Sequence, residues 1–220
     1  MSKLNQLILS FDFEQNFKNL DFYVSKSNST AFNLIKNWSK REKKFLNIIG
    51  EKFSGKSHLI NIFFEQNKGL KIQASNLDSD SLKKVKLYDD IIIEDLTSDI
   101  DEKLLYSLIN IADLENKYLI ITSRISVVEL NFKLLDLRSR LKSFFLSKIE
   151  NPDDDLMFAL ILKNLSDRQI SIDKKLVDYI IKRIDRSYSK ISDFIYKIDH
   201  ISLKKKKSID FKIIKEALGD

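Results

Sequence analysis

The chain has 220 residues, 43% hydrophobic and 32% charged, a composition typical of a folded protein with one core and at most a small second domain. Its net charge of +6 is the balance of 38 basic and 32 acidic side chains mixed along the chain, so it permits nucleic-acid contact without predicting it. The absence of cysteine excludes disulfides and thiol nucleophiles, and two histidines are too few for a histidine-rich metal site. No apolar run has the length of a membrane span or a secretory signal, so we expect a cytoplasmic protein without membrane contact.

The first half of the chain predicts alternating strands and helices. Residues 1 to about 20 have alternating apolar positions and predict an extended segment or a tail. A helix with an apolar stripe from Phe32 to Trp38 follows, and Ser29 or Thr30 can cap it. Strands are expected at 45–49, 90–95 and 118–122, with helices after residue 56 and around 104–114. Their nearly continuous β-branched runs favour parallel strands covered on both faces.

From Pro152 onward the sequence has helical periodicity and no strand pattern. The expected helices each open near an Asp or Ser that can act as the cap, and they cover 153–166, 173–184, 189–202 and 210–218. We therefore expect an α/β protein with a parallel sheet and a small all-helical lid. The predicted parts are an N-terminal tail at 1–13, a nucleotide-binding core at 14–150 and the lid at 151–220.

A glycine-flanked loop between the first strand and the next helix has the pattern G-x-x-x-x-G-K-[ST]. In such a loop the backbone N–H groups face phosphates, the lysine carries positive charge to the terminal phosphates, and the hydroxyl ligates Mg²⁺. The alternative, an ordinary turn between two glycines, has no such chemistry. We expect ADP or ATP with Mg²⁺ to be bound by Gly50, Ser54, Gly55, Lys56, Ser57 and the adjoining His58, for which a plain helix-face position is the alternative.

Two carboxylates end the second strand, where a phosphate loop needs an acidic partner. We place Glu94 on the Mg²⁺ ion and Asp95 near the attacking water; capping of the next helix is the alternative. The third strand ends in Thr122, Ser123 and Arg124, and these polar groups come close to the phosphates if the two strands are neighbours.

The order of phosphate loop, acidic strand, polar strand end and helical lid resembles the AAA+ ATPases, in particular the branch of the replication initiator DnaA and its shorter homologue Hda. Residues 22–28 resemble that family's adenine segment, which implies base contacts by Phe22 and Val24. The segment 136–141 resembles the box that carries the family's arginine finger, with Arg140 at the finger position.

Two further features favour the Hda type within this resemblance. The chain stops just after the lid, where a DnaA chain continues into a DNA-binding domain. The segment with Gln6, Leu7, Leu9 and Phe11 resembles the peptide with which Hda binds the DNA polymerase sliding clamp, although an edge strand packed on the core fits the same alternation. The family's sensor II arginine is missing: Ser189 and Lys190 stand there, and Lys190 is the candidate substitute for binding phosphate.

The resemblance implies a clamp-tethered negative regulator of replication initiation that promotes hydrolysis of DnaA-bound ATP, with Arg140 acting in trans. Because Glu94 is longer than the usual aspartate and sensor II is altered, weak hydrolysis of its own nucleotide is expected. One alternative is a helicase-loader or transposition-helper ATPase that binds single-stranded DNA. A clamp adaptor with a vestigial nucleotide site is another. Weak non-specific DNA contact through 204–207 and homo-oligomerisation remain open.

Overall fold

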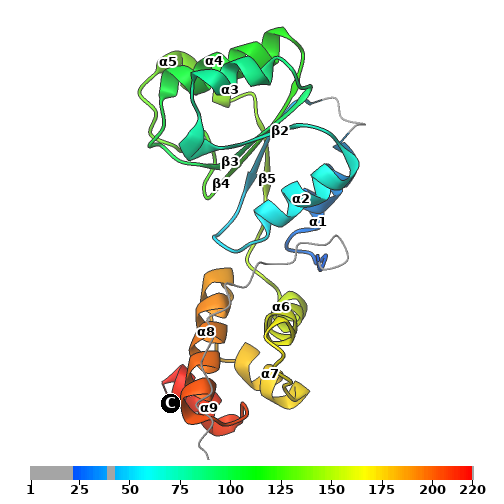
Figure 1. The fold of residues 1–220 in the computed structure, drawn as a ribbon, viewed down its shortest axis with the longest axis vertical. Helices are drawn as coiled ribbons and strands as arrows, with labels where there is room; N and C mark the ends of the chain where they lie inside the picture. Colours follow the sequence, from blue (N-terminus) through cyan, green and yellow to red (C-terminus); the bar gives the residue numbers. More distant parts are fainter. Residues whose placement is uncertain (1–21, 39–42, 220) are drawn as a thin grey trace, which may run out of the picture.

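A computed structural model describes residues 22–38 and 43–219 of the chain, arranged as an α/β core stacked on a helical lid (Figure 1). The predicted clamp-binding residues Gln6, Leu7, Leu9 and Phe11 lie outside the described residues. Within the described ranges no helix is both long and apolar enough to cross a lipid bilayer.

The core is built on a five-stranded parallel sheet with the strand order β2-β3-β4-β1-β5. The strands are β1 (Phe45–Ile49), β2 (Leu70–Gln73), β3 (Asp90–Leu96), β4 (Tyr118–Ser123) and β5 (Phe145–Lys148). Because β4 pairs with both β1 and β3, the loops that follow these three strands emerge side by side. The candidate site lies at this end of the sheet, where the carboxyl ends of β1, β3 and β4 meet.

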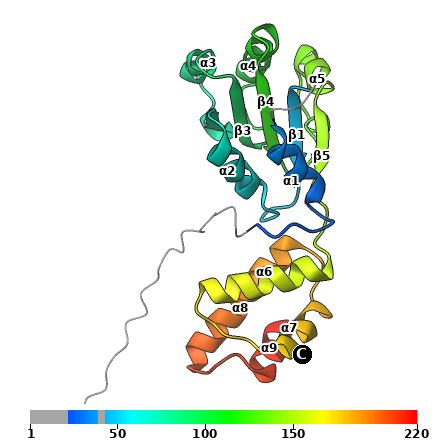
Figure 2. The same cartoon turned by 90° about the vertical axis from the view of Figure 1, so that its right-hand side faces the viewer.

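Helices cover both faces of the sheet (Figures 1 and 2). One face packs against α1 (Ser29–Lys36) and α2 (Lys56–Gln66), and the other against α3 (Ser79–Val85), α4 (Glu102–Leu114) and α5 (Leu135–Leu141). Adjacent β3 residues divide between the two layers, since Ile92 belongs to the first cluster and Ile91 and Ile93 to the second. All three side chains are fully buried, as expected for parallel strands covered on both faces.

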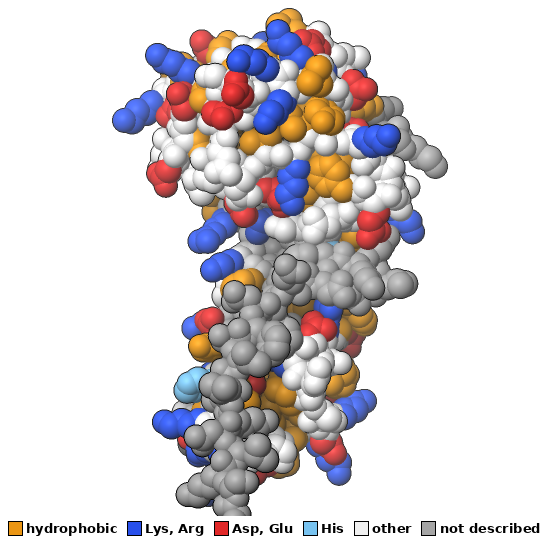
Figure 3. Space-filling view, in the orientation of Figure 1, with side chains coloured by type: hydrophobic (Ala, Val, Ile, Leu, Met, Phe, Trp, Pro, Cys, Tyr) orange, Lys and Arg blue, Asp and Glu red, His pale blue; other side chains and the backbone are white. Residues whose placement is uncertain are grey.

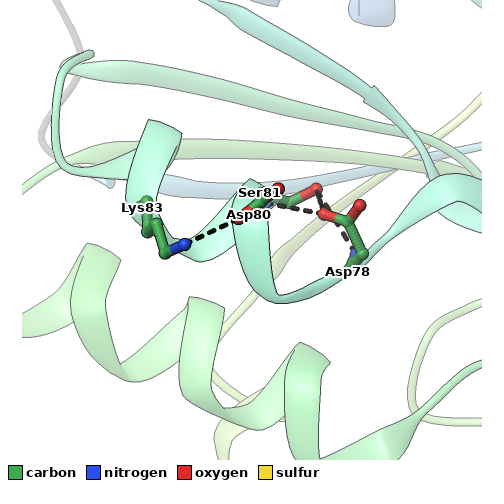
Figure 4. A network of polar contacts seen from close by, with 4 residues as sticks. All are labelled: Asp78, Asp80, Ser81 and Lys83. Carbon is green, nitrogen blue, oxygen red and sulfur yellow. Dashed lines mark hydrogen bonds and ion pairs between the residues drawn. The ribbon is translucent and has the colours of Figure 1, made fainter.

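A short 3-10 helix, η3 (Ala74–Asn76), leads from β2 towards α3, whose start is fixed by a capping box. The Asp78 carboxylate accepts a hydrogen bond from the Ser81 N–H at 2.7 Å, and the Ser81 hydroxyl accepts one from the Asp78 N–H at 3.4 Å. Figure 4 shows this pair beside the exposed ion pair of Asp80 and Lys83. The reciprocal bonds satisfy two N–H groups that a helix start otherwise leaves without a partner.

The lid consists of α6 (Asp154–Asp167), α7 (Lys174–Ile181), α8 (Tyr188–Lys205) and α9 (Phe211–Leu218), which enclose a hydrophobic cluster of their own. Each helix has a side-chain cap at its start, and the four caps are Asp153, Asp173, Ser187 and Asp210. Two buried lid side chains, Leu156 and Tyr188, belong instead to the core cluster under α1 and α2, and the partly buried Leu160 packs against both that cluster and the lid's own. These three residues connect the apolar interiors of core and lid.

The α/β class, the parallel sheet and the helical lid confirm the expectation from the sequence. The predicted capping of the first helix by Ser29 or Thr30 is wrong. Asn28 is the residue before α1, and its side chain turns back to the preceding segment, where it accepts from the Ser25 N–H and donates to the Tyr23 carbonyl. The third lid helix begins at Tyr188, one residue earlier than expected, because Ser187 caps it. Strands β2 and β5 were not expected.

The surface seen in Figure 3 carries Lys and Arg side chains interspersed with Asp and Glu over the core, so this face of the core has no large patch of one charge. The mixed pattern agrees with the nearly balanced composition. Net charge therefore carries no argument for a nucleic-acid surface on this face.

Candidate nucleotide-binding site

A cavity of about 640 Å³ lies between the core and the lid. It is lined by the glycine-flanked loop, by residues at the end of β3 and just after β4, by the segment before α1, and by one face each of α6 and α8. The cavity thus brings residues 52–57 of the loop together with Asp95 and Arg124, which stand at the ends of the neighbouring strands β3 and β4.

Both glycines of the loop occupy positions that a side chain would not fit. A Cβ atom on Gly50 would lie 2.6 Å from the Ser54 Oγ and 3.1 Å from the Ile149 Cβ. Gly55 has a φ of +91° at the start of α2, a conformation that side chains rarely adopt, and Phe22 packs 3.1 Å from where its Cβ would be. The backbone can therefore curl tightly ahead of α2, so that the N–H groups at the helix start are positioned for a phosphate.

Lys56 is buried in the loop and binds back onto it. Its Nζ donates hydrogen bonds to the Gly50 and Glu51 carbonyls at 2.8 and 2.9 Å. Burial lowers the pKa of Lys56; the nearby Arg124 also lowers it, whereas Asp95 and Glu51 oppose the shift. A cation that is desolvated in this way gains stabilisation from an anionic ligand in the cavity.

The loop also holds a buried polar atom that lacks a partner. Ser54 is 4% exposed, and its Oγ has no hydrogen bond within the described residues. Such atoms are uncommon in folded proteins and fit a site that completes its hydrogen bonds with a ligand. Ser57 lines the cavity. His58 also lines it, but its ring is buried edge-on against Phe22, with 5.1 Å between ring centres.

The two strand-end carboxylates have different surroundings. Asp95 lines the cavity at a bulge in β3 with a φ of +54°, its N–H donates to the Thr122 Oγ at 3.0 Å, and Gln73 donates to its carboxylate at 3.3 Å. Glu94 is 3% exposed, is ion-paired with Lys71 of β2, and does not line the cavity. One Glu94 oxygen, Oε1, is buried without a hydrogen bond. Asp95 is therefore the better placed of the two to meet a ligand.

A buried network holds the loop that carries Arg124. Asn47 in β1 donates to the Ile121 carbonyl and the Ser123 hydroxyl and accepts from the Val127 N–H, all within 3.1 Å. Ser123 in turn donates to the Ile125 carbonyl at 2.6 Å. Fixing both ends of this turn leaves Arg124 exposed at the cavity wall, where a guanidinium can contact phosphate.

The segment before α1 places an aromatic ring over the loop. Phe22 lines the cavity and stacks on Phe32, with ring centres 5.6 Å apart and planes 9° apart. Val24, the other expected base contact, is 42% exposed and does not line the cavity, whereas Tyr23 and Asn28 do. The apolar wall on this side consists of Phe22 with Leu156 and Leu160 of α6.

Two further expected site residues lie away from the cavity. Lys190 is exposed near the start of α8 and does not line it, although its neighbours Ile191 and Ser192 do. Arg140 lies on α5 and forms an ion pair with Asp113 at 2.5 Å, with 42% of its side chain exposed. An arginine in that place is available to a partner molecule and not to the chain's own cavity.

Several residues that the structure adds to the site had no signal in the sequence. Lys163, Asn164 and Asp167 line the cavity from α6, and Glu51 links the loop to the lid. The α6 residues are three of many polar residues on lid helices, and only the orientation of the lid turns them inward. A polar residue inside an apolar strand, as at Asn47, is a usable signal for the network behind Arg124.

No family model matches the chain, and no curated protein does. Solved structures do. Domain III of the replication initiation protein DnaA from Thermotoga maritima aligns with a TM-score of 0.77 at 19% identity, covering 94% of this chain and 97% of that one. The replication initiator DnaA bound to AMPPCP and single-stranded DNA aligns with a TM-score of 0.66 at 18% identity over 85% of this chain and 67% of that one. The Thermotoga maritima RuvB Holliday junction branch migration motor aligns with a TM-score of 0.67 at 16% identity, covering 93% of this chain and 73% of that one. The chain thus has a DnaA-like AAA+ fold.

Proposed function

We propose that the protein binds ADP or ATP with Mg²⁺ in the cavity between core and lid. The observation that carries this proposal is the convergence of the glycine-flanked loop, Asp95 and Arg124 on one cavity that the lid closes. Lys56, Arg124 and the N–H groups at the start of α2 would hold the phosphates. Ser57 and Asp95 would face the metal ion, and Glu94 would do so only if it left Lys71.

Lys56 and Ser54 support a fit to phosphate in this cavity. The Lys56 cation is bound to two loop carbonyls, and Ser54 has an unpartnered hydroxyl. A phosphate can provide acceptors for both groups. The apolar wall of Phe22, Leu156 and Leu160 is suited to a flat base.

We further propose that the protein is an Hda-like regulator that promotes hydrolysis of ATP held by DnaA. The likeness of almost the whole chain to domain III of DnaA supports a partner of the same fold, because AAA+ subunits of one shape can stack so that each faces its neighbour's site. Arg140 is exposed on α5, away from the chain's own cavity, as a residue acting on a partner's nucleotide must be. Mg²⁺-bound ATP on the partner supplies the reacting phosphate, and the Arg140 guanidinium would stabilise the charge that develops there.

Tethering to the DNA polymerase sliding clamp is proposed from the sequence of residues 6–11 alone. An extended peptide could bury Leu9 and Phe11 in an apolar pocket of the clamp while Gln6 makes a directional hydrogen bond. Tethering would raise the local concentration of this protein near newly replicated DNA, which gives negative regulation of initiation a physical basis.

The test is a single-turnover assay. ATP is pre-bound to DnaA, and its hydrolysis is followed with and without this protein in the presence of DNA-loaded clamp. Acceleration that depends on both the protein and the clamp supports the proposal. Lack of acceleration, together with DNA-stimulated turnover of the protein's own ATP, would instead support the ssDNA-binding ATPase. Clamp binding with no effect on either ATP pool would support the adaptor.

A further inference from the structure

Glu51, the second residue of the phosphate loop, points its carboxylate to the lid. It accepts hydrogen bonds from the Ser187 hydroxyl at 2.6 Å, from the Tyr188 N–H at 2.9 Å and from the Ser189 N–H at 3.4 Å. These three donors are the cap and the first two residues of α8. A single side chain of the core therefore binds the start of the longest lid helix.

A carboxylate at this position is strongly favoured. The first N–H groups of a helix have no partner inside the helix, and the helix dipole places positive charge there. Partial burial acts to raise the pKa of Glu51, but the hydrogen bonds from Ser187, Ser189 and Tyr188 outweigh it and lower the pKa. Ser187 extends the arrangement, because its hydroxyl also accepts from the Lys190 N–H at 3.2 Å.

The hydrogen bonds of Glu51 and Ser187 determine which groups at the start of α8 can contact a ligand. Its start contributes Tyr188, Ile191 and Ser192 to the cavity, but its first N–H groups are already bound to Glu51 and Ser187. The cation in its first turn, Lys190, does not line the cavity. The start of α8 therefore presents neither a free N–H from residues 188–190 nor a lysine side chain to the last phosphate of a bound nucleotide.

A second contact sets the angle between core and lid at the same point. The Tyr188 hydroxyl donates to the Glu150 carbonyl at 3.1 Å, and its ring is packed in the core cluster, 4% exposed. Glu51 and Tyr188 hold α8 from two directions, with the loop on one side and the end of the sheet on the other. Neither contact involves a nucleotide.

We propose that Glu51 is a lid-positioning residue that sets the angle of the lid independently of the terminal phosphate, so that the cavity does not discriminate between ADP and ATP. This inference rests on the nucleotide binding proposed above. With the lid already in place, binding requires no closure, and the wild-type affinities for ADP and ATP should differ by less than about threefold. A released lid must be ordered by the ligand, so the apparent affinity falls in proportion to the fraction of molecules that are closed.

The experiment measures the distance between core and lid by energy transfer. The chain contains no cysteine, so Lys133→Cys in the core and Lys204→Cys in the lid, both exposed, give a specifically labelled pair. We expect one narrow distance distribution that is the same without nucleotide, with Mg·ADP and with a non-hydrolysable Mg·ATP analogue. A shift of the wild-type distribution between these three states would overturn the proposal.

Glu51→Gln is the informative substitution. The amide keeps the size of the side chain but replaces one carboxylate oxygen with an NH2 group, which donates hydrogen bonds and cannot accept from the helix N–H groups. It should broaden the nucleotide-free distribution and weaken ADP and ATP binding by about tenfold, the loss that corresponds to one charge-assisted hydrogen bond. The matched control is Glu150→Ala, which removes a carboxylate from the same hinge although only the backbone carbonyl of Glu150 binds Tyr188. An unchanged distribution in Glu51→Gln would refute the assignment.

Two readouts separate this inference from simple destabilisation and from the proposed function. Ser187→Ala removes the only side-chain donor among the three groups that bind Glu51, so its effect on nucleotide affinity should be non-additive with that of Glu51→Gln, whereas independent structural damage would add. If the wild-type protein binds no nucleotide, the proposed function fails. The nucleotide-free distance distributions then still decide whether Glu51 positions the lid.

Discussion

Arg140→Ala is the substitution that tests the proposed trans mechanism most directly. Arg140 forms an ion pair with Asp113, its one ion pair among the described residues, and the two side chains are 42% and 47% exposed. Exposed pairs of this kind contribute about 0.2 to 1 kcal/mol. Removing Arg140 should therefore lower the melting temperature by no more than about 4 °C in a chain of this length.

The expected effect on function is far larger. An arginine finger supplied in trans raises the rate of phosphoryl transfer by about 10³ to 10⁵. Arg140→Ala should thus abolish the stimulation of DnaA-bound ATP hydrolysis in the single-turnover assay, while its own nucleotide affinity remains that of the wild type. Arg138→Ala, two residues earlier on the same helix, is the matched control and should have a milder effect, because the two side chains project to different sides of α5.

The ion pair of Arg140 with Asp113 leads to a second prediction, in which a substitution increases the stimulation of ATP hydrolysis and does not abolish it. To reach a partner's phosphate, Arg140 must leave Asp113, and this costs at most about 1 kcal/mol, or about fivefold in rate. Asp113→Ala should therefore leave the stimulation intact or increase it by up to about fivefold. Wild-type stimulation by Arg140→Ala, measured with folded protein, would refute the trans-finger mechanism.

Three further predictions follow from the cavity, the core and the tail. Lys56→Ala should weaken ADP and ATP binding by about tenfold or more in calorimetry, because a buried cation is lost from the phosphate loop; equal affinities would show that the loop is not used. Burial raises the pKa of Asp90 above 3.8 despite the Trp38 indole N–H that binds it, so the folded state holds this proton more tightly and stability falls as pH rises through that range. Asp90→Asn should therefore raise the melting temperature at pH 7, and its advantage over the wild type should shrink towards pH 4. Joint replacement of Leu9 and Phe11 by alanine should abolish clamp binding with little change in melting temperature, whereas a loss of about 2 to 5 kcal/mol for each would indicate a buried edge strand.

The central strands of the sheet could be predicted because both of their faces are buried. Strands β1, β3 and β4 are nearly continuous apolar runs, and the sequence shows them as such. The edge strands β2 and β5 have four residues each and one buried side chain each, Ile72 and Ser147. So little burial leaves neither a continuous run nor a clear alternation in the sequence. Pairing with a central strand, and not local pattern, makes them strands.

The residues of the candidate site likewise differ in whether a local sequence pattern reveals them. The tight turn of the glycine-flanked loop could be predicted because the spacing of Gly50, Gly55 and Lys56 encodes a backbone shape within eight residues. The nearness of Asp95 and Arg124 depends on β3 and β4 being neighbours, a condition that the sequence left open and the structure shows to hold. The contact of Glu51 with Ser187 joins residues 136 positions apart, and it depends on the angle at which the lid meets the core. No local pattern contains that angle, so this part of the site needed the structure.

The separation of the two hydrophobic interiors implies an order of assembly during synthesis. A chain is made from its N-terminus, and the residues of the sheet and of α1 to α5 precede residue 149. The lid buries its own cluster, and among the described lid residues Leu156, Leu160 and Tyr188 pack against the core cluster under α1 and α2. The sheet can therefore form before α8 is made, and Tyr188 docks last. Until then the glycine-flanked loop of a nascent chain is open to solvent on its lid side, so the cavity between core and lid is completed only by the last third of the protein.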